Sequence, residues 1–165
     1  MHTHTHSQFT ISSRAQAKRI AARHGREAAE AQHRDILAEI VRDVAAGDWY
    51  SVAAESATWL GVPQRWLGVY HAEYDRSAAK VAHALRVERA RDLGREDGVS
   101  SALATYRDMR DEPDAQKPLR RDEARTMAAE CAASRIAHRE LDPSVRDEYE
   151  AACTDAHLAA WPVRA

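Results

Sequence analysis

Histidines at the N-terminus and one Glu-x-x-His pair have the residue types and spacing of metal ligands. His2, His4 and His6 alternate along the first residues, but a terminal arm offers no neighbouring groups to fix the imidazole rings. Glu30 and His33 have the spacing found in di-iron helical bundles. That chemistry requires two such motifs and two further glutamates, and the sequence contains one motif. Neither group predicts a metal site.

Two cysteines and two histidines near the C-terminus suggest a zinc site at first sight. Cys153 and His157 lie one helical turn apart, and Cys131 and His138 lie on a preceding segment. Residues seven apart on a helix are separated by about 10 Å, however, which is too far for them to share one tetrahedral ion. We interpret both cysteines as buried neutral thiols.

Catalytic motifs are lacking. The sequence shows no Gly-rich phosphate loop, nucleophile elbow or Cys-His-Asp arrangement. We expect no enzymatic activity, no catalytic residue, no cofactor and no metal.

The composition favours thin helices that approach one another closely. Leu, Ile, Val and Phe total only 25 of 165 residues, whereas alanine contributes 34, and alanine has the highest helix propensity. Lys and Arg (24) nearly balance Asp and Glu (26), so the chain as a whole is not a general polyanion binder. The 21 arginines against 3 lysines fit either a GC-rich genome or a preference for phosphate. Bulky anchors are supplied by the tryptophans Trp49, Trp59, Trp66 and Trp161.

The first residues, the lack of a long apolar run and the two cysteines bear on the location of the protein. The first nine residues lack the basic-then-apolar pattern of a signal peptide, and no apolar run approaches the ~20 residues of a membrane span. Two cysteines are too few for a disulfide framework. We expect a cytoplasmic protein without membrane contact.

The helical periodicity predicts an all-α fold of six or seven helices in one compact domain, without a sheet. Gly94 and Gly98 would let two helices approach closely, but a turn there is the simpler interpretation. We expect a flexible arm over residues 1–11 and a domain over 12–165, whose first helix starts at a Ser13–Gln16 capping box. Within the domain we expect a helix-turn-helix-like segment over 49–75, a loop over 111–118 and a helical hairpin over 119–161. The hairpin includes a helix cap at Asp142-Pro143.

One segment points to a function. Residues 49–71 read WYSVAAESATWLGVPQRWLGVYH. Ala57 is small where two helices would cross, and Gly61 permits a left-handed turn. Leu60, Val62, Leu67 and Tyr70 stand where they would hold the second helix on the first. The segment resembles the helix-turn-helix of excisionase-like and mercury-regulator-like DNA-binding domains.

The resemblance implies a recognition helix that begins at Pro63. Its early exposed residues, which would face the major groove, are Gln64, Arg65, Gly68 and Val69. Gln suits adenine and Arg suits guanine, through bidentate hydrogen bonds. Phosphate contacts would come from the basic residues before this segment, namely Arg14, Lys18, Arg19, Arg23 and Arg26.

Two functions are therefore open. The first is a small helix-turn-helix protein that binds double-stranded DNA, as a regulator or recombination accessory factor, with C-terminal helices that brace it or form a homodimer. The second is a non-enzymatic helical protein that binds a protein partner, as an adaptor, assembly factor or inhibitor of a phage or mobile element. In the second case the acidic C-terminal half would be the more active surface.

Overall fold

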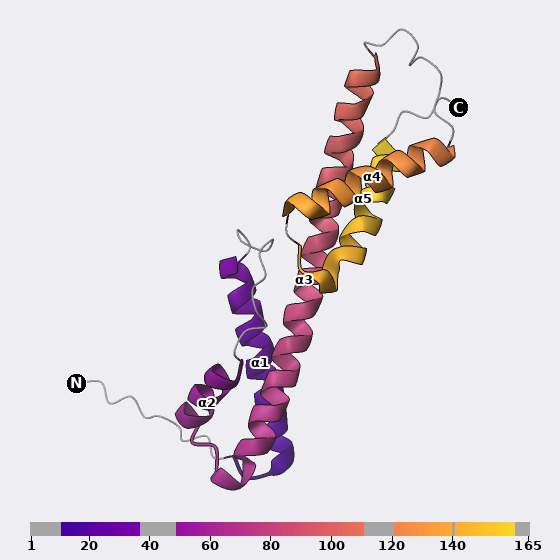
Figure 1. Ribbon diagram of the computed structural model, residues 1–165. Helices are drawn as coiled ribbons and strands as arrows, with labels where there is room; N and C mark the ends of the chain where they lie inside the picture. Colours follow the sequence, from indigo (N-terminus) through magenta and orange to yellow (C-terminus); the bar gives the residue numbers. More distant parts are fainter. Residues whose placement is uncertain (1–10, 37–48, 111–120, 140, 161–165) are drawn as a thin grey trace, which may run out of the picture. The chain divides into compact units, whose positions relative to one another are not determined.

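The structure is a computed structural model that describes residues 11–36, 49–110, 121–139 and 141–160 (Figure 1). Every regular element in these ranges is helical and none is a strand, so the all-α prediction is confirmed. Five α-helices are present here rather than six or seven. They are α1 (Arg14–Ile36), α2 (Trp49–Trp59), α3 (Gln64–Arg110), α4 (Arg121–Arg139) and α5 (Arg146–Ala160), with a short 3-10 helix η1 (Pro143–Val145) before α5.

The smaller number of helices follows from Gly94 and Gly98, where the prediction of a turn was wrong. Both glycines lie inside α3, which continues to Arg110. A Cβ at Gly94 would come within 2.5 Å of the Tyr149 carbonyl oxygen, and one at Gly98 would overlap the carbonyl oxygen of Cys153. The two glycines therefore let α3 and α5 pack backbone to backbone, and this packing outweighs their low helix propensity.

The described residues form two compact units rather than the expected single domain. The first holds α1, α2 and α3 as far as His83, and the second holds α3 from Ala84 with α4, η1 and α5. Two separate clusters of buried side chains account for the division. Along α3 the first cluster ends at Ala78 and the second begins at Ala90. A boundary inside a continuous helix leaves no loop or composition change that a sequence would reveal.

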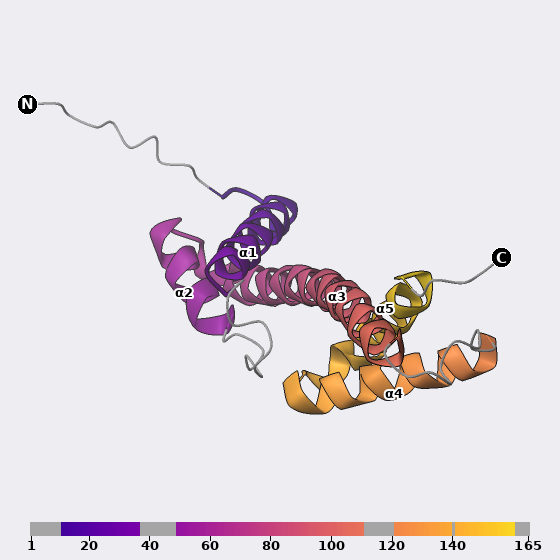
Figure 2. The same ribbon diagram turned by 90° about the horizontal axis from the view of Figure 1, so that it is seen from above.

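In the first unit, α1 and α2 flank the first part of α3, and α1 runs in the same direction as α3 (Figures 1 and 2). Ser13 caps α1 as predicted, because its Oγ accepts a hydrogen bond from the Gln16 N–H at 3.2 Å. Gly25 brings α1 against α3, since a Cβ there would meet backbone atoms of Tyr74 and Ala78. The largest fully buried side chains of this core are the tyrosines Tyr70 and Tyr74.

The second unit is held by a buried ionic cluster. Asp97 accepts two hydrogen bonds from Arg139, at 2.6 and 2.8 Å, and a third, short one from the hydroxyl of Tyr149. These contacts join α3, α4 and α5. Asp142 caps η1 as predicted, because its Oδ1 accepts from the Ser144 N–H at 2.8 Å.

The exposure of the tryptophans and of the N-terminal residues agrees with the predictions only in part. Trp49 is buried and Trp66 is half-buried, but Trp59 is 83% exposed and is no core anchor. Ile11, which we assigned to a flexible arm, is 2% exposed and belongs to the first core. The rest of that arm, the predicted loop over 111–118 and Trp161 lie outside the described residues.

Candidate nucleic-acid interface

The turn between α2 and α3 has the geometry of a glycine-capped helix end. Gly61 has a φ of 59°, its N–H donates to the Thr58 carbonyl at 3.1 Å, and the Val62 N–H donates to the Ala57 carbonyl at 3.0 Å. This pair of bonds defines the Schellman motif, in which a left-handed residue after the helix satisfies its last carbonyls. The sequence Leu60–Pro63 therefore stops α2 sharply and lets α3 begin at Gln64.

The residues expected to hold α2 against α3 are packed in the first core. Ala57, Val62 and Tyr70 are buried, with exposures of 2%, 8% and 0%. Leu60 and Leu67 are partly buried against the same cluster. The segment thus forms a helix, a tight turn and a second helix that share one core.

The base-reading candidates lie on the outer side of the start of α3. Gln64, Arg65 and Gly68 are exposed, and Val69 is half-buried. The Arg65 guanidinium carbon lies 5.4 Å from the centroid of the Trp66 ring, a cation–π distance that restrains this side chain. Among the described residues, Arg65 takes part in no ion pair.

All five candidates for phosphate contacts are exposed. They fall into two groups according to their position around the axis of α1. Successive helical residues are rotated by about 100°, and Gly25 faces α3. Relative to Gly25, the side chains of Arg19, Arg23 and Arg26 are rotated by roughly 100–160°, so they point away from α3.

The side chains of the other two candidates, Arg14 and Lys18, are rotated by only about 20° from Gly25 around the axis of α1. They stand in the first turns of α1, at the end of the unit where α3 also begins (Figure 1). At the end of the unit where Gln64 and Arg65 lie, Arg14 and Lys18 therefore occupy the face of α1 that points towards α3, whereas Arg19, Arg23 and Arg26 occupy a different face.

Sequence reasoning missed a polar cluster in the first unit. The Ser56 hydroxyl lies 2.8 Å from the Tyr70 hydroxyl, and His24 Nδ1 lies 3.3 Å from each of these two oxygens. Burial, and next the charge of Arg23, lower the pKa of His24, although Glu27 opposes them. Burial raises the pKa of Tyr70. The three residues are 14 to 46 positions apart in sequence, so no local pattern joins them.

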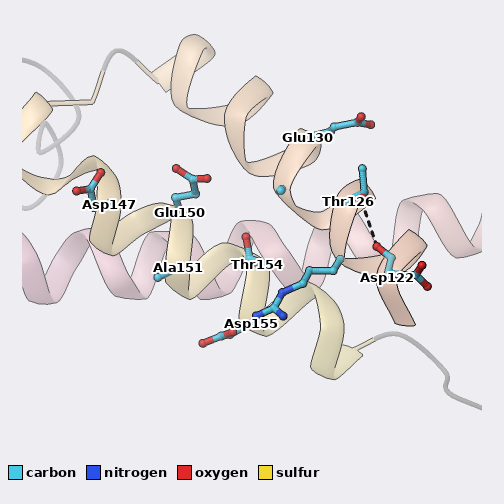
Figure 3. Close-up of a pocket in the computed structure, with 10 residues that line it drawn as sticks. Asp122, Thr126, Glu130, Asp147, Glu150, Ala151, Thr154 and Asp155 are labelled. Carbon is cyan, nitrogen blue, oxygen red and sulfur yellow. Dashed lines mark hydrogen bonds between the residues drawn. The ribbon is translucent and has the colours of Figure 1, made fainter. Parts of the chain in front are cut away.

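The second unit carries a contrasting surface, an acidic groove between α4 and α5 of about 840 Å³ (Figure 3). Glu130 and Asp122 come from α4, and Asp147 and Glu150 come from α5. Asp155 is a fifth carboxylate, and Arg125 is the single basic residue of the lining. Ala129 and Ala151 also line the groove. The Thr126 hydroxyl donates to the Asp122 carbonyl within α4 at 3.1 Å. The groove is suited to cationic side chains rather than to DNA.

Comparison with protein-family models, curated proteins and solved structures finds no match to this chain. The described part of the chain holds no group of three or more His, Cys, Asp or Glu side chains placed to bind a metal ion. None of its helices has a stretch apolar and long enough to cross a bilayer. Cys153 is buried, and burial raises the pKa of its thiol to about 11.

Proposed function

We propose that this chain is a small helix-turn-helix protein that binds double-stranded DNA, as a regulator or recombination accessory factor. The observation that carries the proposal is the α2–turn–α3 arrangement. It places Gln64, Arg65 and Gly68, all exposed, in the first two turns of a helix that follows a Gly61 turn. A recognition helix contacts base edges with its N-terminal residues, and these are the residues that this fold exposes.

The chemistry of this end of the unit suits a polyanion with base edges. Gln64 and Arg65 have the planar groups that bind adenine and guanine in bidentate fashion. The N-termini of α1 and α3 carry the positive ends of two helix dipoles, which favour phosphate. Arg14 and Lys18 add two charges at the same end, and no described carboxylate forms an ion pair with either of them.

Fluorescence anisotropy of a labelled mixed-sequence duplex, at ~50 and ~200 mM salt, tests the proposal. About four phosphate contacts would lower the affinity on the order of 100-fold across this range. Gln64→Ala/Arg65→Ala should weaken binding, because both base-reading groups are lost.

The matched control is Arg107→Ala, which removes an exposed arginine from the second unit's part of α3. This variant should bind as wild type does. Absence of binding at micromolar protein in low salt would reject the proposal, and equal losses in the two variants would assign any binding to net charge alone.

A helical protein that binds a protein partner is the second candidate, and the acidic groove favours it. Five carboxylates and one guanidinium line the groove, so the fitting partner is a basic helix or peptide. If wild type does not bind DNA, isothermal titration with an arginine-rich helical peptide would test this function. Binding that Asp147→Lys/Glu150→Lys abolishes would support it, and binding that this variant leaves unchanged would reject it.

A further inference from the structure

The groove between α4 and α5 gathers charges that have no counter-charge within the second unit. Its five carboxylates are exposed and come from both helices (Figure 3), namely Asp122, Glu130, Asp147, Glu150 and Asp155. Among the described residues, none of these carboxylates takes part in an ion pair, and neither does Arg125, the one guanidinium of the lining. Like charges along one concave surface raise the local potential, so a cationic occupant would stabilise the groove.

Small side chains line the groove between its carboxylates. On each helix an aspartate is followed by two small residues at spacings of four and three, as Asp122, Thr126 and Ala129 on α4 and as Asp147, Ala151 and Thr154 on α5. Residues at these spacings share one face of a helix. Because the small side chains leave room for a close approach of backbones, the groove can seat one face of a further helix.

The chain itself carries a helix face of complementary composition, on α1. Small and basic residues alternate there at spacings of four, three and four, as Ala15, Arg19, Ala22 and Arg26. Relative to Gly25, which faces α3, this face is rotated by about 60–120° around the axis of α1. Ala22 is half-buried and the other three residues are exposed. Beside this face Arg23 and Glu27 pair with each other at 3.7 Å, whereas in the described part of the chain Arg19 and Arg26 form no ion pair.

The two surfaces match in spacing as well as in charge. Arg19 and Arg26 are seven residues apart, about 10 Å along α1. On α4 and on α5 alike, the outermost carboxylates of the groove are eight residues apart, about 12 Å along the helix. Both guanidinium groups can therefore reach a carboxylate while the alanines between them face the small residues of the groove. The exceptions also have opposite charges, since Glu30 follows Arg26 by one turn and Arg125 lines the groove.

We propose that the groove between α4 and α5 binds the Ala15–Arg26 face of α1 from a second copy of this chain. The contact joins two different surfaces, and every copy carries both, so association continues past a pair into a ring or an open chain. It is weak and sensitive to salt, because exposed ion pairs contribute little each and are screened. The proposal names an occupant for the groove that favours the second candidate function, and it does not rest on DNA binding.

Sedimentation equilibrium of the full chain, without DNA, tests the contact. At ~50 mM salt the weight-average mass should rise above that of the monomer by roughly half or more at ~0.5 mM protein, and ~500 mM salt should return it to the monomer. Arg19→Ala/Arg26→Ala should stay monomeric. The matched control is Arg14→Ala/Lys18→Ala, which removes the same charge from another face of α1 and should associate as wild type does.

Mixing two variants identifies the two surfaces. Arg19→Ala/Arg26→Ala keeps the groove, and Asp147→Lys/Glu150→Lys keeps the α1 face, so neither should associate alone and an equal mixture should form a heterodimer of two chains. A mixture that stays monomeric, or association that survives in either variant alone, would overturn the proposal. Wild type that is monomeric at ~0.5 mM protein and ~50 mM salt would overturn it without any variant. If that monomer bound an arginine-rich peptide, the groove would belong to a different protein partner.

Discussion

The two units of this chain bury a tyrosine hydroxyl with different hydrogen-bond partners. In each, alanine-rich helices approach closely at glycines and bury a tyrosine whose hydroxyl must find a partner. The Tyr70 hydroxyl in the first unit contacts the Ser56 hydroxyl and the His24 imidazole, which are neutral groups. The Tyr149 hydroxyl in the second unit donates to the Asp97 carboxylate, which also accepts from the guanidinium of Arg139. One core is thus closed by neutral groups and the other by an ion pair.

The difference predicts that the two clusters lose their contributions to stability in different pH ranges. The lowered pKa of His24 means that its contribution to stability is present above about pH 6.5 and is lost as the pH falls from there through the folded-state pKa. For Asp97, burial alone would raise the pKa, but hydrogen bonds from Arg139 and Tyr149 outweigh burial and lower it. Its contribution is therefore kept down to about pH 4, the ordinary value of the carboxyl, and is lost as the pH falls through the lowered one.

The largest effect is expected where α3 meets α5. Gly98→Ala places a methyl group against the Cys153 carbonyl and within 2.9 Å of the His157 backbone nitrogen. Because backbone cannot yield as a flexible side chain does, we expect a loss of about 3 kcal/mol in the free energy of unfolding of the second unit. Hydrogen exchange of the α5 amides measures it.

Gly68→Ala is the matched control, since a Cβ at Gly68 would meet nothing within 4 Å. It should stabilise the first unit by about 1 kcal/mol, the difference in helix propensity. A Gly98→Ala protein as stable as wild type would show that α3 and α5 are not packed through this glycine.

The next largest effect should come from the ion pair. Asp97→Asn keeps the shape of the side chain but leaves Arg139 without its counter-charge. The side chain of Asp97 is 8% exposed and that of Arg139 is 30% exposed, so the loss should be about 2–3 kcal/mol, below that of a fully buried pair. Urea unfolding followed by circular dichroism measures the change. A loss below about 0.5 kcal/mol, the level of a surface pair, would contradict the contrast between the two units.

The smallest effect is the order in which the units respond to acid. Amide hydrogen exchange at pH 5.5, corrected for the intrinsic rate, should show protection reduced in α1 and α2, and in α5 around His157, whose pKa burial also lowers, but retained in α4, which the Asp97–Arg139 ion pair holds. At pH 3 both units should lose protection. Equal loss of protection in the two units at pH 5.5 would remove the difference between a neutral and an ionic cluster.

Local signals in the sequence located the helix ends well. Ser13, Gly61 and Asp142 act through neighbours two to five residues away, and the predicted cap or turn is present at each. Gly94 and Gly98 were misjudged because their role depends on α5, about fifty residues later. Without that partner a glycine in a helix is only a cost of about 1 kcal/mol.

The sequence predicts which residue types could contact DNA, but not which of them lie on the same face of the first unit. The run of Arg19, Arg23 and Arg26 fits one helical face in the sequence as well as Arg14 and Lys18 fit another. Only the contact of Gly25 with the backbone of Tyr74 and Ala78 shows which face of α1 points towards α3. The His24 cluster and the exposure of Trp59 likewise depend on contacts between distant segments.

The most direct test of the proposed DNA surface compares two charge-matched variants, Arg14→Ala/Lys18→Ala and Arg19→Ala/Arg26→Ala. Each removes two exposed positive charges from α1. Duplex binding measured by anisotropy across the same salt range should weaken in the first variant, with a salt slope shallower by about two. The second variant should keep the wild-type slope. Equal slopes in the two variants, or a loss confined to the second, would contradict a DNA surface at the common start of α1 and α3.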